Sequence, residues 1–286
     1  MLPLTVGLAL LVGVSLGLLG GGGSILTVPL LAYVAGMDAK QAIATSLLVV
    51  GTTSAVAAVS HARAGRVQWR TGLIFGAAGM AGAYGGGLLA QYIPGTVLLI
   101  GFAVMMIATA VAMLRGRKEI GPADPHHRIP VPKVILEGLV VGLVTGLVGA
   151  GGGFLVVPAL ALLGGLPMPV AVGTSLVVIA MKSFAGFAGY LSSVSIDWRL
   201  AGMVTAAAVV GALLGARLTA LVNPDSLRQA FGWFVLLMSS VILAEEIHPA
   251  AGVAMAVLTL AAMAVYYLRS RRARDTPAGT LVAVET

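Results

Sequence analysis

The sequence contains no cysteine, and few of its residues carry charge. Without cysteine it can form neither disulfides nor thiolate metal sites, and it offers no cysteine nucleophile. Charged residues make up 9% of the 286 residues, whereas a typical soluble domain has about a quarter. Hydrophobic residues make up 59%, and they form runs long enough to cross a bilayer. These features predict an integral membrane protein that is surrounded by lipid.

Signatures of catalysis are missing as well. The sequence has no GxxxxGK[ST] or HExxH motif, and no Asp or Glu lies in the middle of an apolar run. No nucleophile–base or acid–base pair occurs within these runs, so we expect no catalytic residue, no cofactor and no metal site, and hence no enzyme. The net charge of +7 does not predict a nucleic-acid partner, because membrane proteins collect Lys and Arg in cytoplasmic loops.

The sequence contains an internal repeat. Residues 17–50, shifted by 129 positions, match residues 146–179 without a gap at 16 of 34 positions. Pro, Thr-Ser and Trp-Arg positions coincide in the same register, for example Trp69-Arg70 with Trp198-Arg199. A bias towards small apolar residues does not align such varied residues, so the pattern indicates a duplication.

Each copy contains two short apolar segments joined by a glycine-rich tip and followed by three full-length spans. The short segments are 3–20 and 24–36 in the first copy, and 133–149 and 153–165 in the second. The seven expected spans, counting one extra at the end, are 39–62, 70–92, 96–114, 168–191, 198–221, 227–244 and 249–268. This predicts a first membrane repeat over 1–114, a cytoplasmic linker over 115–132, a second repeat plus the extra span over 133–268, and a tail over 269–286.

Basic residues indicate how the short segments lie. If each pair forms a hairpin that returns to its own side, 14 of the Lys and Arg fall inside and 2 outside. If each pair crosses once, the numbers are 9 and 7. Hydropathy alone is compatible with seven or eight spans. Because cytoplasmic loops are rich in Lys and Arg, we expect hairpins, a multi-pass protein of the inner (plasma) membrane and a cytoplasmic C-terminus. The two copies are then inverted, which is typical of secondary transporters.

The two tips are candidate substrate-binding segments. Glycine runs at membrane depth need partners for their freed backbone groups unless they line a cavity. Each tip also precedes a predicted helix start, where unpaired N–H groups attract anions. The alternative is that these glycines only permit close helix packing. The tip residues are Gly20, Gly21, Gly22, Gly23 and Ser24 in the first copy, and Gly149, Gly151, Gly152 and Gly153 in the second.

Hydroxyl groups and one lysine complete the predicted site. Thr45-Ser46 and their repeat mates Thr174-Ser175 could donate to an oxyanion, or bond back to their own helix. Lys182 lies deep in the span 168–191, which has no acidic residue. Intramembrane charges usually face a cavity or a partner, so its ammonium is a candidate counter-charge for an anion. The alternatives are that burial neutralises the amine or that it reaches a carbonyl group.

The patterns GLLGGGGSILTVPLL…ATSL and GLVGAGGGFLVVPAL…GTSL resemble the TauE/SafE family of sulfite-exporter-type permeases. The resemblance covers residues 5–268, and it implies transport of a sulfur-containing anion such as sulfite or an organosulfonate. The motif positions it carries over are Gly20, Gly22, Gly23, Pro29, Thr45, Ser46, Gly149, Gly151, Gly152, Pro158, Thr174 and Ser175. Lys182 is not a motif position of the family, so it rests on the burial argument alone.

The predicted fold is therefore an all-α integral membrane protein with an inverted repeat, two glycine-tipped hairpins and about seven spans. The predicted function is secondary transport of a small anion, and the partners are this anion and the lipid bilayer. The alternatives are an anion channel, or a membrane-embedded assembly subunit that transports nothing itself. A coupling proton or ion and a homo-oligomeric state are left open.

Overall fold

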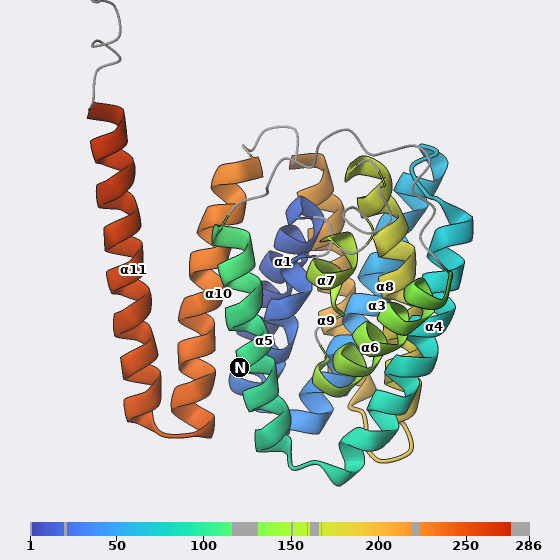
Figure 1. Cartoon of the computed structure of the whole chain (residues 1–286). Helices are drawn as coiled ribbons and strands as arrows, with labels where there is room; N and C mark the ends of the chain where they lie inside the picture. The colour runs from blue at the N-terminus through green and yellow to red at the C-terminus, as the bar shows by residue number, and fades with distance from the viewer. Residues whose placement is uncertain are drawn as a thin grey trace, which may run out of the picture.

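The structure is a computed structural model that describes residues 2–19, 22–115, 131–149, 151–158, 160, 166, 168–218 and 224–275. Within these ranges every regular element is helical, and Figure 1 shows most helices gathered side by side with α11 at one edge. Seven of the described helices are long and apolar enough to cross a bilayer. The predicted all-α membrane fold is confirmed.

The spanning helices lie close to the predicted positions. They are α3 (Ala39–Arg63), α4 (Trp69–Leu89), α5 (Gly95–Leu114), α8 (Met168–Tyr190), α9 (Trp198–Leu218), α10 (Pro224–Glu246) and α11 (Pro249–Asp275). A short helix, η3 (Ala90–Tyr92), continues α4. Hydropathy located these spans because a helix satisfies all of its own backbone groups and is one of the two structures that can cross lipid.

The first hairpin consists of α1 (Leu2–Leu19) and a returning segment of three short helices. These are η1 (Gly22–Leu26), α2 (Thr27–Pro29) and the π-helical turn η2 (Leu30–Val34). Because both η1 and η2 contact α1, the chain turns back along α1 after the first tip. The helical pattern changes directly after Pro29, which has no N–H to donate to the preceding turn.

The second hairpin begins with α6 (Val131–Val148) and continues after the tip with α7 (Gly153–Pro158). Residues 159 and 161–165 of the predicted returning segment lie outside the described residues. The same holds for Gly20 and Gly21 of the first tip and for residues 116–130 of the predicted linker.

The two copies exchange packing partners, since α1 packs on α9 and α6 packs on α4. At one contact, a Cβ built on Gly13 would collide with the backbone of Ala208; at the other, a Cβ on Gly142 would collide with the backbone of Gly79. These pairs are repeat mates, because a shift of 129 residues converts one into the other. The duplication therefore extends to tertiary contacts, while opposite orientation in the bilayer stays a prediction.

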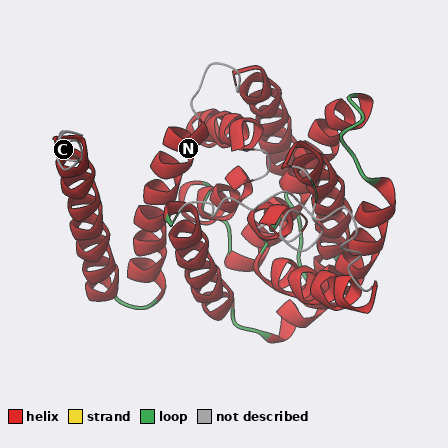
Figure 2. Ribbon diagram, turned by 45° about the horizontal axis from the view of Figure 1, so that its top comes forward, coloured by secondary structure: helices red, strands yellow, loops and turns green. Residues whose placement is uncertain are grey.

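The centre of the bundle is formed by α3 and α8, which are the most buried of the spans and pack on each other. Helix α11 is the least buried span, and Figure 2 shows it beside α10 at the edge of the bundle. Both predicted hydroxyl pairs and Lys182 lie on the two central helices. The functional candidates are therefore in the most protected part of the fold.

Candidate functional site

The backbone of the second tip depends on glycine. Gly149, Gly151 and Gly152 have φ angles of +77°, +61° and +63°, which side chains with a Cβ rarely adopt. A helix begins at Gly153, as predicted. After the first tip, a helix begins at Gly22, two residues before the predicted start at Ser24.

Two hydroxyl groups from neighbouring helices hold the end of α6 just before the second tip. Ser46 Oγ on α3 donates to the carbonyl oxygen of Gly149 at 3.0 Å. The hydroxyl of Tyr190 on α8 donates to the carbonyl oxygen of Leu147 at 2.8 Å. The last carbonyls of a helix have no partner within the helix, so these two bonds satisfy buried acceptors and fix the position of the tip.

The two tips meet inside the protein, where α7 contacts η1. A Cβ built on Gly151 would lie 3.4 Å from the Cβ of Ser24, and it would collide with Val50. Ser24 is completely buried. The absence of a side chain at Gly151 thus allows the second tip to approach the start of the first returning segment.

Lys182 lies against the second tip with its amine completely enclosed. The residue is 1% exposed, and Nζ has no hydrogen-bond partner among the described residues. A Cβ on Gly152 would lie 2.5 Å from Nζ and would also collide with Thr145. We call Ser24, Ser46, Gly149, Gly151, Gly152 and Lys182 the second-tip cluster. It combines a lysine amine, hydroxyl groups and backbone that a ligand can approach closely, which are groups that can bind an anion.

Among the described residues, no hydrogen bond joins the other predicted hydroxyls, those of Thr45, Thr174 and Ser175, to this cluster. Thr45 is completely buried, and its Oγ1 has no partner among the described residues. Thr174 Oγ1 accepts a hydrogen bond from the backbone N–H of Gln68 at 2.9 Å. Ser175 Oγ donates to the carbonyl of Val172 at 2.8 Å, which is the back-bonding alternative. Gly22 and Gly23 lie in η1.

Sequence reasoning overlooked two buried serines, Ser54 on α3 and Ser183 on α8. Both are at most 1% exposed, and neither hydroxyl has a partner within the described part of the chain. They are repeat mates, as are Thr53 and Lys182. This repeated hydroxyl was the available signal, because a serine stands at the same position of an apolar span in both copies.

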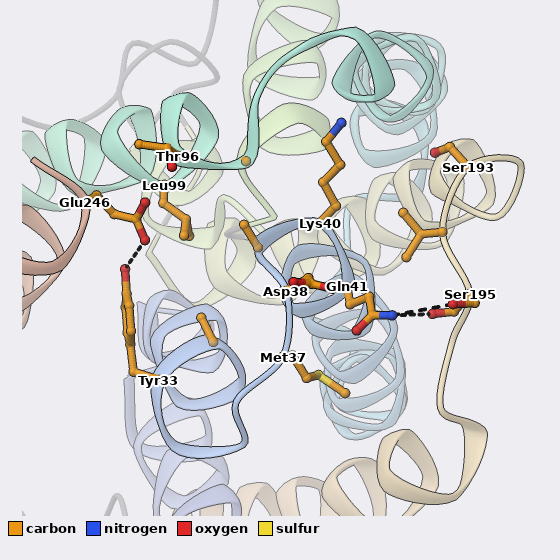
Figure 3. A pocket seen from close by; sticks show the side chains of 14 residues that line it. Tyr33, Met37, Asp38, Lys40, Gln41, Thr96, Leu99, Ser193, Ser195 and Glu246 are labelled. Carbon is orange, nitrogen blue, oxygen red and sulfur yellow. Dashed lines mark hydrogen bonds between the residues drawn. The ribbon is translucent and has the colours of Figure 1, made fainter.

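A polar pocket of about 660 Å³ opens at the end of the bundle where α3 and α5 begin and α10 ends. Figure 3 shows the hydroxyl of Tyr33 facing Glu246, to which it donates at 3.2 Å. Gln41 Nε2 donates to the backbone oxygen of Ser195 at 3.3 Å. These bonds link the first hairpin and α3 to the second copy, and no sequence motif pointed to this pocket.

Comparisons with known proteins agree with the repeat pattern. The family described as "Sulfite exporter TauE/SafE" matches residues 5–242. A "Probable membrane transporter protein" of Xylella fastidiosa (strain 9a5c) is 34% identical, over 83% of this chain and 93% of its own. The "Probable membrane transporter protein YdhB" of Bacillus subtilis is 28% identical, over 77% of this chain and 91% of its own. No solved structure matches this chain.

Proposed function

Because this chain belongs to the TauE/SafE sulfite exporter family and is a multi-pass membrane transporter, we propose that it carries a small anion across the membrane. The substrate class is a sulfur oxyanion such as sulfite, or an organosulfonate. The family description and the buried amine at the second tip support this substrate class together. The site would lie inside the bundle, between the two copies.

The observation that carries the proposal is the enclosed amine of Lys182 beside Gly152. Burying an ammonium without a counter-ion is costly. The helices that pack on α8 contain one acidic residue, Glu137 of α6, and Nζ has no hydrogen-bond partner among the described residues. An anion bound at the second-tip cluster would supply the missing charge. Ser24, which lies beside Gly151, and the backbone of the second tip would contact its oxygens.

The polar pocket would be the access route from one side. Its lining comes from η2 and the residues between η2 and α3, from the first turns of α3 and α5, from the loop that follows α8 and from the last residue of α10. Under the hairpin topology these segments face the outside of the inner (plasma) membrane, and the C-terminus faces the cytoplasm. Alternating access would then come from movement of one copy against the other.

The test is uptake of labelled anions by the purified full chain in liposomes. The panel contains sulfite, thiosulfate, sulfate, methanesulfonate, acetate and chloride. We expect saturable uptake of a sulfur-containing anion that the unlabelled compound competes with, and counterflow when the liposomes are preloaded with it. Liposomes without protein give the background.

Other outcomes would contradict the proposal in distinguishable ways. Flux without saturation or counterflow would indicate an anion channel. No uptake of any anion by correctly inserted protein would contradict anion transport, and co-purification with a second protein at a fixed ratio would then indicate an assembly subunit.

A further inference from the structure

The amine of Lys182 is buried where a permanent positive charge would have nothing to balance it. The residue is 1% exposed, and Nζ has no hydrogen-bond partner among the described residues. Its aliphatic stem packs against Gly79 of α4, since a Cβ there would lie 3.7 Å from Lys182 Cβ and 3.8 Å from Cδ. The amine itself lies beside Gly152 and is not accessible to solvent in this conformation.

The charged groups around Lys182 do not neutralise it. Helix α8 packs on α3, α4, α6 and α7. The titratable residues of these helices and of α8 itself are Lys40, His61, Arg63, Arg70, Tyr84, Lys133, Glu137 and Tyr190. The hydroxyl of Tyr190 donates its hydrogen bond to the carbonyl oxygen of Leu147. Glu137 is the one carboxylate in the set. It is the seventh of the 18 residues of α6, is partly exposed, and makes no hydrogen bond to Nζ.

The lysine is present in only one of the two copies. Its repeat mate Thr53 donates to the carbonyls of Val49 at 2.8 Å and Val50 at 3.1 Å on its own helix. The hydroxyl of Thr53 is thus satisfied locally, whereas the amine of Lys182 is not. One titratable amine in an otherwise duplicated core indicates a single protonation site per chain.

We propose that Lys182 is the group that couples the movement of the anion to the movement of a proton. This deepens the proposed anion transport and rests on it. In the empty site the amine is neutral. When an anion A⁻ binds beside Gly152, the amine takes up a proton, so that R–NH₂ + H⁺ + A⁻ becomes R–NH₃⁺···A⁻. On the other side of the membrane the site releases the anion together with the proton, and no covalent bond other than N–H forms or breaks.

The physical reason is that neither charge is stable alone in this enclosed site. A buried ammonium or a buried anion by itself carries a large desolvation cost, whereas the pair compensates it in part. Anion binding and protonation therefore favour each other, and by linkage each must raise the affinity for the other. The carrier would cross between its two states either empty and neutral or loaded with an anion–proton pair.

The experiment measures proton uptake on anion binding by the detergent-purified full chain in weakly buffered solution. The probes are thiosulfate, sulfate and methanesulfonate, whose own charges stay fixed near neutral pH. Anion binding is measured separately with labelled probe. Four variants accompany the natural chain, namely Lys182→Arg, Lys182→Met, Glu137→Gln and Thr53→Val. Arginine keeps its charge at all accessible pH values, so Lys182→Arg can bind an anion without taking up a proton.

The expected result is uptake of about one proton per bound anion, with an affinity that falls about tenfold per pH unit where the empty amine is neutral. Glu137→Gln and Thr53→Val keep this proton uptake. Lys182→Met loses both binding and proton uptake, and Lys182→Arg, if it folds, binds without proton uptake.

Anion binding by the natural chain without proton uptake would overturn the coupling and leave anion transport standing. Loss of proton uptake in Glu137→Gln with binding intact would assign the proton to Glu137 and also overturn the proposal. The absence of binding for every probe, sulfite included, would overturn the proposed function itself. The first and the last of these outcomes are measured on the natural chain alone, so the test of coupling does not depend on the folding of a variant.

Discussion

Lys182 Nζ lies so close to Gly152 that a Cβ on this glycine would be 2.5 Å from the nitrogen. The amine therefore touches the backbone of the second tip directly. Gly152 has a φ of +63°, so the same residue both shapes the turn and leaves room for the charge. A glycine tip and a buried lysine, which look like separate features in the sequence, form one site.

We predict that Gly152→Ala abolishes anion transport. Alanine at this φ costs about 1–2 kcal/mol, and its methyl group would displace Lys182 or Thr145. Thermal unfolding in detergent and uptake into liposomes measure the two effects. Gly36→Ala is the matched control, because Gly36 has a φ of +70° but no atom within 4 Å of a Cβ. Gly36→Ala should lose only the stability that the unfavourable backbone conformation costs, and it should keep anion uptake. Equal uptake by both variants would contradict the prediction.

We predict that Ser46→Ala lowers the free energy of unfolding by about 1 kcal/mol and impairs transport, because the Gly149 carbonyl loses its donor. Thr52→Val on the same helix is the control, since Thr52 Oγ1 bonds only to its own helix at Leu48. Chemical denaturation in detergent gives the first quantity. If both variants were equally stable and active, the bond would not hold the tip.

We predict that Gly13→Val and Gly142→Val impair folding to a similar extent. Each glycine packs directly on the backbone of a helix from the other copy, and an added side chain would separate the helices at a cost of about 3 kcal/mol. Gly7→Val should be tolerated, because no atom lies within 4 Å of a Cβ at Gly7. Size-exclusion profiles and thermal stability measure this. A tolerant Gly142 beside a sensitive Gly13 would contradict the exchange of equivalent contacts.

We predict that neutralising the acids of the polar pocket speeds anion capture from that side. Asp38 and Glu246 line the pocket, and their negative charge repels an incoming anion. Asp38→Asn and Glu246→Gln should raise initial uptake about twofold at low salt, with the gain lost at high salt. Glu245→Gln is the control, because Glu245 is exposed and does not line the pocket. An unchanged or salt-insensitive rate would exclude the pocket as the route.

We predict that Ser195 and Ala64 face opposite sides of the membrane. Ser195 precedes α9 and Ala64 follows α3, and the hairpin topology places Ser195 outside and Ala64 inside. The chain has no cysteine, so Ser195→Cys and Ala64→Cys each introduce a single reactive thiol. An impermeant maleimide on whole cells should label only Ser195→Cys. Labelling of both positions from the same side would rule out this topology.

The positions of the spans and the glycine-rich tips could be predicted from the sequence alone. A bilayer requires helices of nearly fixed length with an apolar surface, so α3, α4 and α5 are visible as hydropathy. Duplication is equally visible, because Trp69-Arg70 and Trp198-Arg199 keep one register. The burial of Lys182 could be predicted too, because it lies deep in its span, far from either end.

The partners of these residues were decided only by the tertiary structure. Nothing in the sequence indicates that Lys182 lies beside Gly152 or that Ser46 donates to the carbonyl of Gly149. Nor does it indicate that Thr174 accepts a hydrogen bond from the backbone of Gln68. Such contacts depend on how each helix is rotated and how far it slides against its neighbours. In lipid, where apolar faces attract each other weakly, close packing of small residues sets that geometry. Hydropathy carries almost no information about how the helices rotate and slide against each other, so the spans could be predicted but the site contacts could not.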